Sequence, residues 1–229
     1  MTSDNVLAQA LRWFNDPLNW QGPQGIPALT GEHLVMSLAA VALATAIALP
    51  LGVWLGHRPR GGTTAVMAAN TSRALPTLAL LFVFATTGLG FGDRPTVLAA
   101  ALFAIPPILS HAFTGVREVD PAARDAARGM GMSSARVLTS VELPLAAPLI
   151  AAGLRTATVQ VVATVPLAAL VGGGGLGTVI VTGFATQHYG QVIAGGVLVA
   201  AVCLAVEGVL ALGQRALTPA PLRAVAVAR

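Results

Sequence analysis

The stretch LVMSLAAVALATAIALPLGVWL, residues 34–55, decides the fold class of this chain. It is apolar and carries no charged residue, and about 20 such residues cross the hydrocarbon core of a bilayer as one helix. Further runs of similar character follow it. The predicted spans are residues 34–55, 65–86, 96–113, 145–165 and 192–212. We therefore predict an all-α polytopic membrane helix bundle with five transmembrane helices.

The composition of the chain agrees with a membrane protein. Of its 229 residues, 55% are hydrophobic and 10% are charged, whereas about a quarter of the residues in a soluble domain are charged. The net charge is +4. Its basic residues are arginines, and most of them lie in short segments between apolar runs, which is typical of cytoplasmic membrane loops. We therefore expect no nucleic-acid partner.

The placement of arginine sets the predicted orientation. Most arginines follow the first, third and fifth predicted spans: Arg58, Arg60, Arg73, Arg117, Arg124, Arg128, Arg136, Arg215, Arg223 and Arg229. Because cytoplasmic loops are enriched in basic residues, we expect the N-terminus outside and the C-terminus inside.

The chain divides into three predicted parts. Residues 1–29 form an external segment in which Trp13, Phe14 and Trp20 favour anchoring at the membrane interface, with a poorly ordered extension as the alternative. Residues 30–213 form the transmembrane domain, and residues 214–229 form a cytoplasmic tail. Without a basic start followed by an apolar core, the N-terminus does not resemble a cleavable signal peptide.

The longest polar interruption is residues 115–144, GVREVDPAARDAARGMGMSSARVLTSVELP. Asp120 stands before a proline, which is typical of a helix start. Gly131 permits a sharp turn, and Ser133 or Ser134 can cap a second short helix. We predict a helix–turn–helix on the cytoplasmic face between the third and fourth spans.

The spacing inside this loop resembles that of ABC importer permeases. These carry Glu-Ala-Ala, three residues, Gly, nine residues, Ile, one residue and Leu-Pro. The matching residues here are Asp125, Ala126, Ala127, Gly131, Val141, Leu143 and Pro144. Asp replaces Glu and Val replaces Ile at two of these positions. The resemblance implies the type I ABC importer permease fold. It also implies that this loop is a coupling helix that docks on an ATP-hydrolysing subunit, whereas the alternative is a solvated loop.

A glycine-rich stretch, VGGGGLG at residues 171–177, precedes the fifth span. It is not a phosphate-binding loop, because no Lys followed by Ser or Thr comes after its last glycine. It resembles the external loop of osmoprotectant and methionine-type permeases. The resemblance implies a flexible turn at an external gate, formed by Gly172, Gly173, Gly174, Gly175 and Gly177. A turn with only a packing role is the alternative.

Three further runs resemble the osmoprotectant branch of these permeases: residues 73–80, 125–132 and 153–158. This branch carries glycine betaine, carnitine, choline or proline-type solutes. The chain is therefore expected to be the permease subunit of an ATP-driven importer in the bacterial cytoplasmic membrane. A permease for methionine or another amino acid is the alternative.

The resemblance also implies the partners. These are separate ABC ATPase subunits that bind ATP and Mg, a second permease subunit that is a copy or a related chain, and an extracytoplasmic solute-binding protein. The chain itself is expected to bind no cofactor.

Two ionisable residues lie within predicted spans. Arg155 is about 16 Å of helix from the cytoplasmic end of the fourth span, and Glu207 is about 12 Å from that of the fifth. Because these depths are similar, we predict an ion pair between the two helices, with a structural role before a substrate-binding one.

Other functional classes find little support in the sequence. The histidines at positions 33, 57, 111 and 188 lack the spacing of metal ligands, and the spans contain no Asp. We therefore expect no metal site, no catalytic residue and no enzyme. An ATP-independent secondary transporter is an alternative of a different class, but such proteins usually contain internal repeats, which we do not find.

Overall fold

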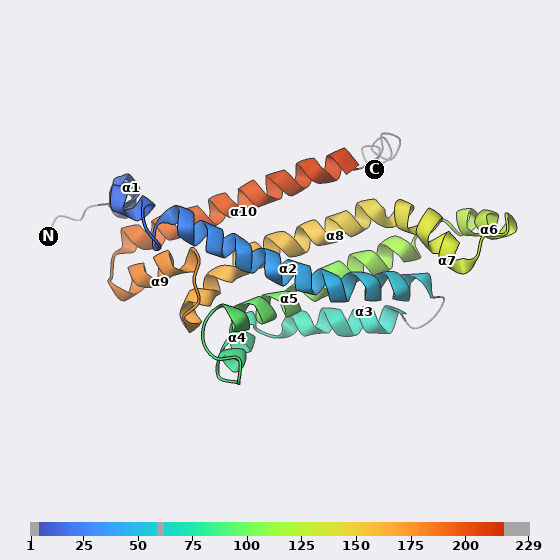
Figure 1. Cartoon of the computed structure of the whole chain (residues 1–229), viewed down its shortest axis with the longest axis horizontal. Coiled ribbons are helices and arrows are strands. Elements are labelled where there is room, and N and C mark those ends of the chain that lie inside the picture. Colours follow the sequence, from blue (N-terminus) through green and yellow to red (C-terminus); the bar gives the residue numbers. More distant parts are fainter. Residues whose placement is uncertain (1–4, 59–61, 218–229) are drawn as a thin grey trace. The chain divides into compact units, whose positions relative to one another are not determined.

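The computed structural model describes residues 5–58 and 62–217, which contain helices and no strand (Figure 1). In chain order the helices are α1 (Val6–Asn15), η1 (Pro17–Trp20), α2 (Ile26–His57), α3 (Gly62–Thr71), η2 (Ser72–Ala74), α4 (Thr77–Ala85), α5 (Asp93–Arg117), α6 (Pro121–Gly129), α7 (Ser134–Val137), η3 (Leu138–Glu142), α8 (Leu143–Thr164), η4 (Val165–Val171), α9 (Gly177–Ala185) and α10 (Tyr189–Leu217). The predicted all-α class is confirmed. Arg60 and most of the predicted tail, residues 218–229, lie outside the described residues.

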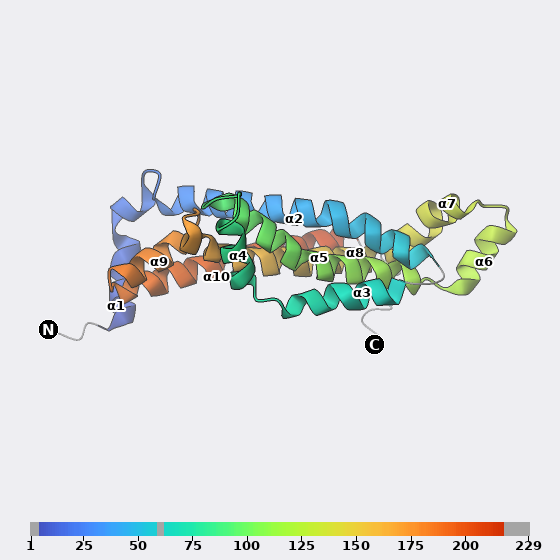
Figure 2. The same cartoon turned by 90° about the horizontal axis from the view of Figure 1, so that it is seen from below.

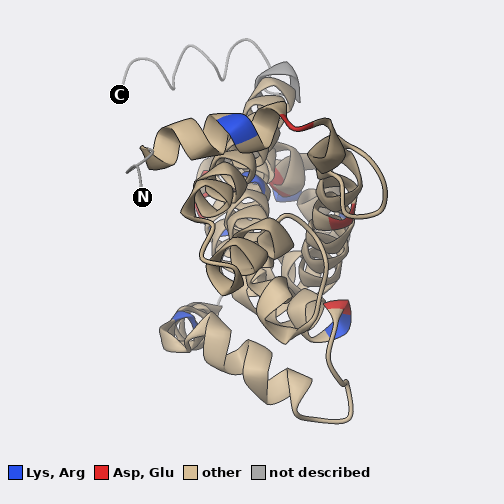
Figure 3. Ribbon diagram, turned by 90° about the vertical axis from the view of Figure 1, so that its left-hand side faces the viewer, with Lys and Arg blue, Asp and Glu red and all other residues tan. Residues whose placement is uncertain are grey.

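Four of the predicted spans coincide with long apolar helices. Within the described residues, Ile26–His57, Asp93–Arg117, Ser134–Val171 and Tyr189–Gln214 are long and apolar enough to cross a membrane. The basic and acidic residues, coloured in Figure 3, are few along these helices. The chain is therefore a multi-pass membrane protein, as its composition predicts.

The second predicted span, residues 65–86, is not one straight helix. Gly62–Ala74 and Thr77–Ala85 are bent by 80° relative to each other, so the chain has five spans if this pair counts as one. Pro76 explains the break, because proline lacks a backbone N–H and disfavours the helical conformation of the residue before it. Arg73 lies inside this predicted span, in the short turn Ser72–Ala74 at the bend.

The chain forms two compact units. The first comprises Met1–Ala42, Leu75–Phe103 and Thr158–Val206, and the second comprises Leu43–Ala74, Ala104–Ala157 and Glu207–Arg229. Helices α2, α5, α8 and α10 each contribute to both units.

Apolar packing holds each unit together. In the first unit, Leu81, Ala85, Ala99 and Val171 form one buried cluster. In the second unit, α2 lies close to α5 because Gly52 has no side chain. A Cβ added to Gly52 would lie 2.7 Å from the carbonyl oxygen of Leu109. Small residues at such contacts are typical of helices that pack within membranes.

Within the N-terminal segment, Val6–Asn15 form the amphipathic helix α1. Asn5 caps α1 by accepting a hydrogen bond from the backbone N–H of Leu7 at 3.2 Å. Beyond the helix, the indole N–H of Trp20 donates to the carbonyl of Phe14 at 2.8 Å. Leu11 on α1 is exposed. The position of this segment at the membrane interface stays a prediction.

Candidate functional site

The polar loop folds as the helix–turn–helix that its sequence predicts (Figure 2). The Asp120 carboxylate caps α6 by accepting a hydrogen bond from the backbone N–H of Ala122 at 2.8 Å. The chain then turns at Gly131, whose φ of 81° is a left-handed conformation that glycine adopts without strain. Ser133 occupies the N-cap position of α7 but makes no capping hydrogen bond through its side chain.

Helix α6 buries one face and exposes the other. Ala127 is 2% exposed and is the buried residue of this helix. Asp125 and Ala126 are exposed, and the carboxylate of Asp125 lies 3.5 Å from the guanidinium of Arg128. Two of the three residues at the Glu-Ala-Ala positions therefore face outward, where a partner could contact them.

The other motif residues lie where the loop joins the fourth span. Val141 and Leu143 are half-buried, and Pro144 stands in the first turn of α8. The second short helix does not stop before them, because Ser134–Val171 is continuous. Its turn at Leu138–Glu142 is π-helical. Such turns contain one extra residue and are frequent at functional sites.

The π-helical turn carries a buried acid that the sequence analysis missed. The side chain of Glu142 is 1% exposed. Its Oε2 accepts a hydrogen bond from Nδ1 of His57, the last residue of α2, at 2.6 Å. The other ring nitrogen of His57 lies 2.7 Å from the hydroxyl oxygen of Ser134.

Arg124 supplies the second partner of Glu142. Its Nε lies 2.8 Å from Oε1 of Glu142, as an ion pair without the alignment of a hydrogen bond. The same guanidinium donates to the carbonyl oxygen of Val116 and, at 3.4 Å, to that of Arg117, in the last turn of α5. We call His57, Arg124, Ser134 and Glu142 the loop cluster.

The glycine-rich stretch forms a closely held turn. The backbone N–H of Gly174 donates to Oδ1 of Asp93 at 2.9 Å. The N–H of Gly175 donates to Oε2 of Glu32 at 3.0 Å. Gly175 also has a φ of 82°. Two carboxylates thus hold this turn through its backbone.

Steric limits explain other glycines of the same turn. A Cβ on Gly177 would lie 2.0 Å from the carbonyl oxygen of Pro166, and one on Gly173 would lie 2.9 Å from the side chain of Ala168. Gly172 has a φ of 73°. The geometry is that of a packed turn, and a role at a gate stays a prediction.

Arg155 and Glu207 form the ion pair that was predicted from their similar depths. Nε of Arg155 donates to Oε1 of Glu207 at 2.8 Å, and its Nη1 donates to the side-chain oxygen of Gln214 at 3.2 Å. Both charged side chains are about one-third exposed, at 34% and 35%. This contact can stabilise α8 against α10 without touching the substrate.

His33 is fully buried in α2. Its Nε2 donates to the carbonyl of Val162 at 2.9 Å, and its Nδ1 has no hydrogen-bond partner. In the part of the chain that the structure describes, no group of His, Cys, Asp or Glu side chains could hold a metal ion.

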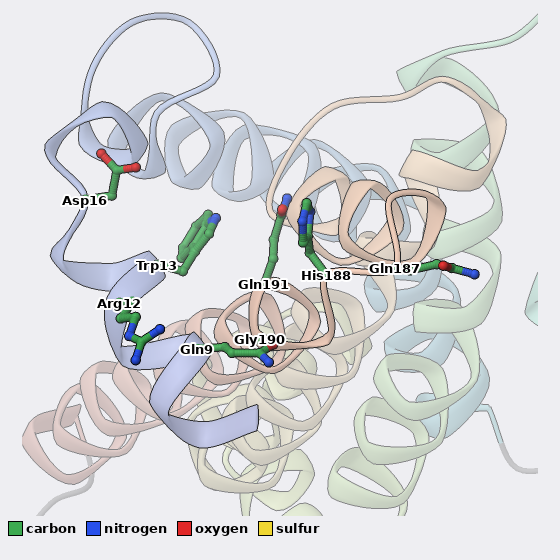
Figure 4. A pocket seen from close by; sticks show the side chains of 8 residues that line it. All are labelled: Gln9, Arg12, Trp13, Asp16, Gln187, His188, Gly190 and Gln191. Carbon is green, nitrogen blue, oxygen red and sulfur yellow. The ribbon is translucent and has the colours of Figure 1, made fainter. Parts of the chain in front are cut away.

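A cavity of about 500 Å³ lies between α1 and the turn from α9 to α10 (Figure 4). Its lining residues are Gln9, Arg12, Trp13, Asp16, Gln187, His188, Gly190 and Gln191. Both charged side chains, Arg12 and Asp16, are exposed. An ion pair between a ligand and such an exposed side chain would contribute only about 1 kcal/mol to binding. The cavity alone therefore does not identify a ligand.

Comparison with known proteins shows the family. Residues 48–219 match the family described as binding-protein-dependent transport system inner membrane component. The choline transport system permease protein OpuBB of Bacillus subtilis is 39% identical over 194 residues, which are 85% of this chain and 89% of that protein. The glycine betaine/carnitine/choline permease protein OpuCB of the same organism is 39% identical over 127 residues, 56% of this chain and 58% of that protein.

Solved structures show the same fold. A chain of the inward-facing MetNI methionine ABC transporter has a TM-score of 0.74 at 22% identity, with 89% of this chain and 99% of that chain covered. A chain of an amino acid ABC transporter has a TM-score of 0.69 at 18% identity, with 94% and 99% covered. At such identities the likeness concerns the fold alone. The chain belongs to the binding-protein-dependent transport system inner membrane components, and its fold is that of a type I ABC importer permease.

Proposed function

We propose that this chain forms the translocation path of an ATP-driven importer for a small compatible solute with a quaternary ammonium group, such as glycine betaine, choline or carnitine. The observation that carries the proposal is the 39% identity to a choline permease over 89% of that protein's length. An osmoprotectant import permease of Salmonella typhimurium, OsmW, is also 35% identical over 135 residues. The fold likeness to a methionine transporter does not favour methionine, because it extends to permeases of different solutes.

In this proposal, α6 is the coupling helix. Its exposed Asp125 and Ala126 contact a separate ATPase subunit, which binds ATP and Mg and hydrolyses the ATP. Two features support the assignment. The buried Ala127 fixes one face of α6 to its own unit, and the turn at Gly131 leads directly into the helix that becomes the fourth span.

The proposed orientation places α6 in the cytoplasm and the turn at residues 172–177 outside. The arginines Arg117, Arg124, Arg128 and Arg136 support it, because they lie in or beside the loop. Outside, the turn lies where a solute-binding protein delivers its solute. A second permease subunit completes the path, because the described spans of one chain are too few to enclose it.

The experiment that tests the solute is competitive uptake. The chain is reconstituted into proteoliposomes with its ATPase, binding protein and second permease subunit. Uptake of radiolabelled glycine betaine is measured against excess choline, carnitine, proline and methionine. We expect quaternary ammonium solutes to be transported or to compete. Transport of methionine alone would contradict the proposed solute class and leave the family unchanged.

A further inference from the structure

The loop cluster is centred on one acid that is removed from water. Glu142 is 1% exposed, and a carboxylate at such a site is costly to bury unless cationic groups and hydrogen bonds compensate it. His57 and Arg124 provide that compensation, at 2.6 Å and 2.8 Å from its two oxygens. Removal of the charge would therefore leave the side chain of Arg124, 17% exposed, without its counter-charge.

The partners of Glu142 come from separate elements of one unit. His57 ends α2, Arg124 belongs to α6, and Glu142 itself lies directly before α8. Through Arg124 the cluster also reaches the carbonyl of Val116 in α5. One carboxylate thus connects the short helix α6 to the ends of three long helices. Figure 2 shows α6 and α7 at the end of the molecule where these helix ends lie.

Besides this cluster, α6 packs on α7 and on the π-helical turn, which belong to the same continuous helix as α8. Ala127 is the buried residue of this helix. Asp125 pairs with Arg128 of the same helix, and that contact does not reach another element. Among the described side chains of α6, Arg124 is the one with ion-pair and hydrogen-bond contacts to other elements. A displacement of α6 would therefore act on α2 through Arg124 and Glu142, and on α5 and α8 through these contacts together with the short chain segments that join α6 to them.

We infer that Glu142 is a positioning residue of ATPase coupling. It holds Arg124 and His57 so that a movement of α6 also moves the ends of α2, α5 and α8. This role rests on the function proposed above. It assigns a purpose to the residue between Val141 and Leu143, which the spacing of the loop motif leaves unspecified. Without its charge, α6 still engages the ATPase, but the spans no longer follow it.

The test is the number of solute molecules imported per ATP hydrolysed. Proteoliposomes carry the complete transporter, and uptake and ATP hydrolysis are measured on the same sample and normalised to assembled complex. For Glu142→Gln we expect hydrolysis to persist and the ratio to fall about tenfold, a typical size for coupling between two sites. A purely structural role would lower the amount of complex and leave the ratio unchanged.

Matched variants make the result decisive. Glu118→Gln is the same substitution at an exposed position of the loop, and its ratio should equal that of the wild type. Glu142→Asp keeps the charge and should restore part of the ratio. If Glu142→Gln does not assemble, His57→Gln carries the test, because it leaves Glu142 beside Arg124, and it should also lower the ratio.

Two results would overturn the inference in different ways. A wild-type ratio in both Glu142→Gln and His57→Gln, with ATP-dependent uptake intact, would refute the role of Glu142 alone. Uptake by the wild-type transporter that does not depend on ATP would refute the proposed function, and the role of Glu142 with it.

Discussion

The loop at residues 115–144 and the turn at residues 172–177 are held by opposite means. In the loop, charged side chains from separate helices meet at the buried Glu142. In the turn, the missing side chains of glycine let the backbone approach its neighbours, and backbone N–H groups donate to Asp93 and Glu32. The loop should therefore be most sensitive to the removal of charges, and the turn should be most sensitive to the addition of atoms.

The largest effect should follow from adding one methyl group to the turn. In Gly177→Ala the new Cβ would lie 2.0 Å from the carbonyl oxygen of Pro166, and backbone cannot move away as a side-chain end can. We expect a loss of about 3 kcal/mol in the free energy of unfolding. Denaturant titration in detergent micelles measures it.

Gly208→Ala is the matched control for this variant. No atom lies within 4 Å of the position that its Cβ would occupy, and alanine is the better helix former. An equal loss in both variants would show that the turn is not closely packed.

The next largest effect should follow from breaking the ion pair between Arg155 and Glu207, which lies outside the loop. Glu207→Gln leaves Arg155 in its helix with the weaker partner Gln214. Because a lone charge within a span is less favourable than no charge, the single variant should unfold at a lower temperature than the double variant Glu207→Gln/Arg155→Met. Thermal unfolding of the purified chain decides this. A double variant that is less stable than the single one would contradict a structural role for the pair.

The hydrogen bonds of the turn should each contribute less. Asp93→Ala removes the acceptor of the Gly174 N–H, and we expect a loss of about 1.5 kcal/mol in stability, typical of a hydrogen bond to a charged group. Asp93→Asn keeps an acceptor oxygen and should lose less. Hydrogen exchange at the N–H of Gly174 reports the bond directly, and unchanged protection in Asp93→Ala would contradict it.

The smallest effects distinguish the two N-cap positions of the loop, Asp120 and Ser133. The Asp120 side chain caps α6, so Asp120→Ala should lower stability by about 1 kcal/mol. Ser133 stands at the start of α7 without a capping bond, so Ser133→Ala should change it by only a few tenths of a kcal/mol. Denaturant titration compares the two variants. Equal losses would mean that both serve as caps.

Features encoded by neighbouring residues were predictable from the sequence. Long apolar runs predicted the four long apolar helices, and Asp120 with Gly131 predicted the helix–turn–helix. The spacing of the loop motif indicated the family that residues 48–219 match. In each case the signal lies within one continuous segment of the sequence.

Features that depend on distant partners were not predictable. His57 is 85 residues from Glu142 in the sequence. Glu32 is 143 residues from Gly175, whose backbone N–H donates a hydrogen bond to it. The 80° bend was also missed, although Pro76 marks its position in the sequence. Arg155 and Glu207 are an exception, because their depth along two neighbouring spans limited where a partner could lie.

The central claim is that α6 couples an ATPase to solute import, and one measurement tests it most directly. ATP-dependent uptake of glycine betaine is measured in proteoliposomes with the wild-type chain, with Asp125→Arg/Gly131→Trp, and with the exposed control Glu118→Gln. We predict uptake that requires ATP in the wild type and in the control, and none in the double variant. Uptake without ATP, or uptake that the double variant leaves intact, would contradict the account.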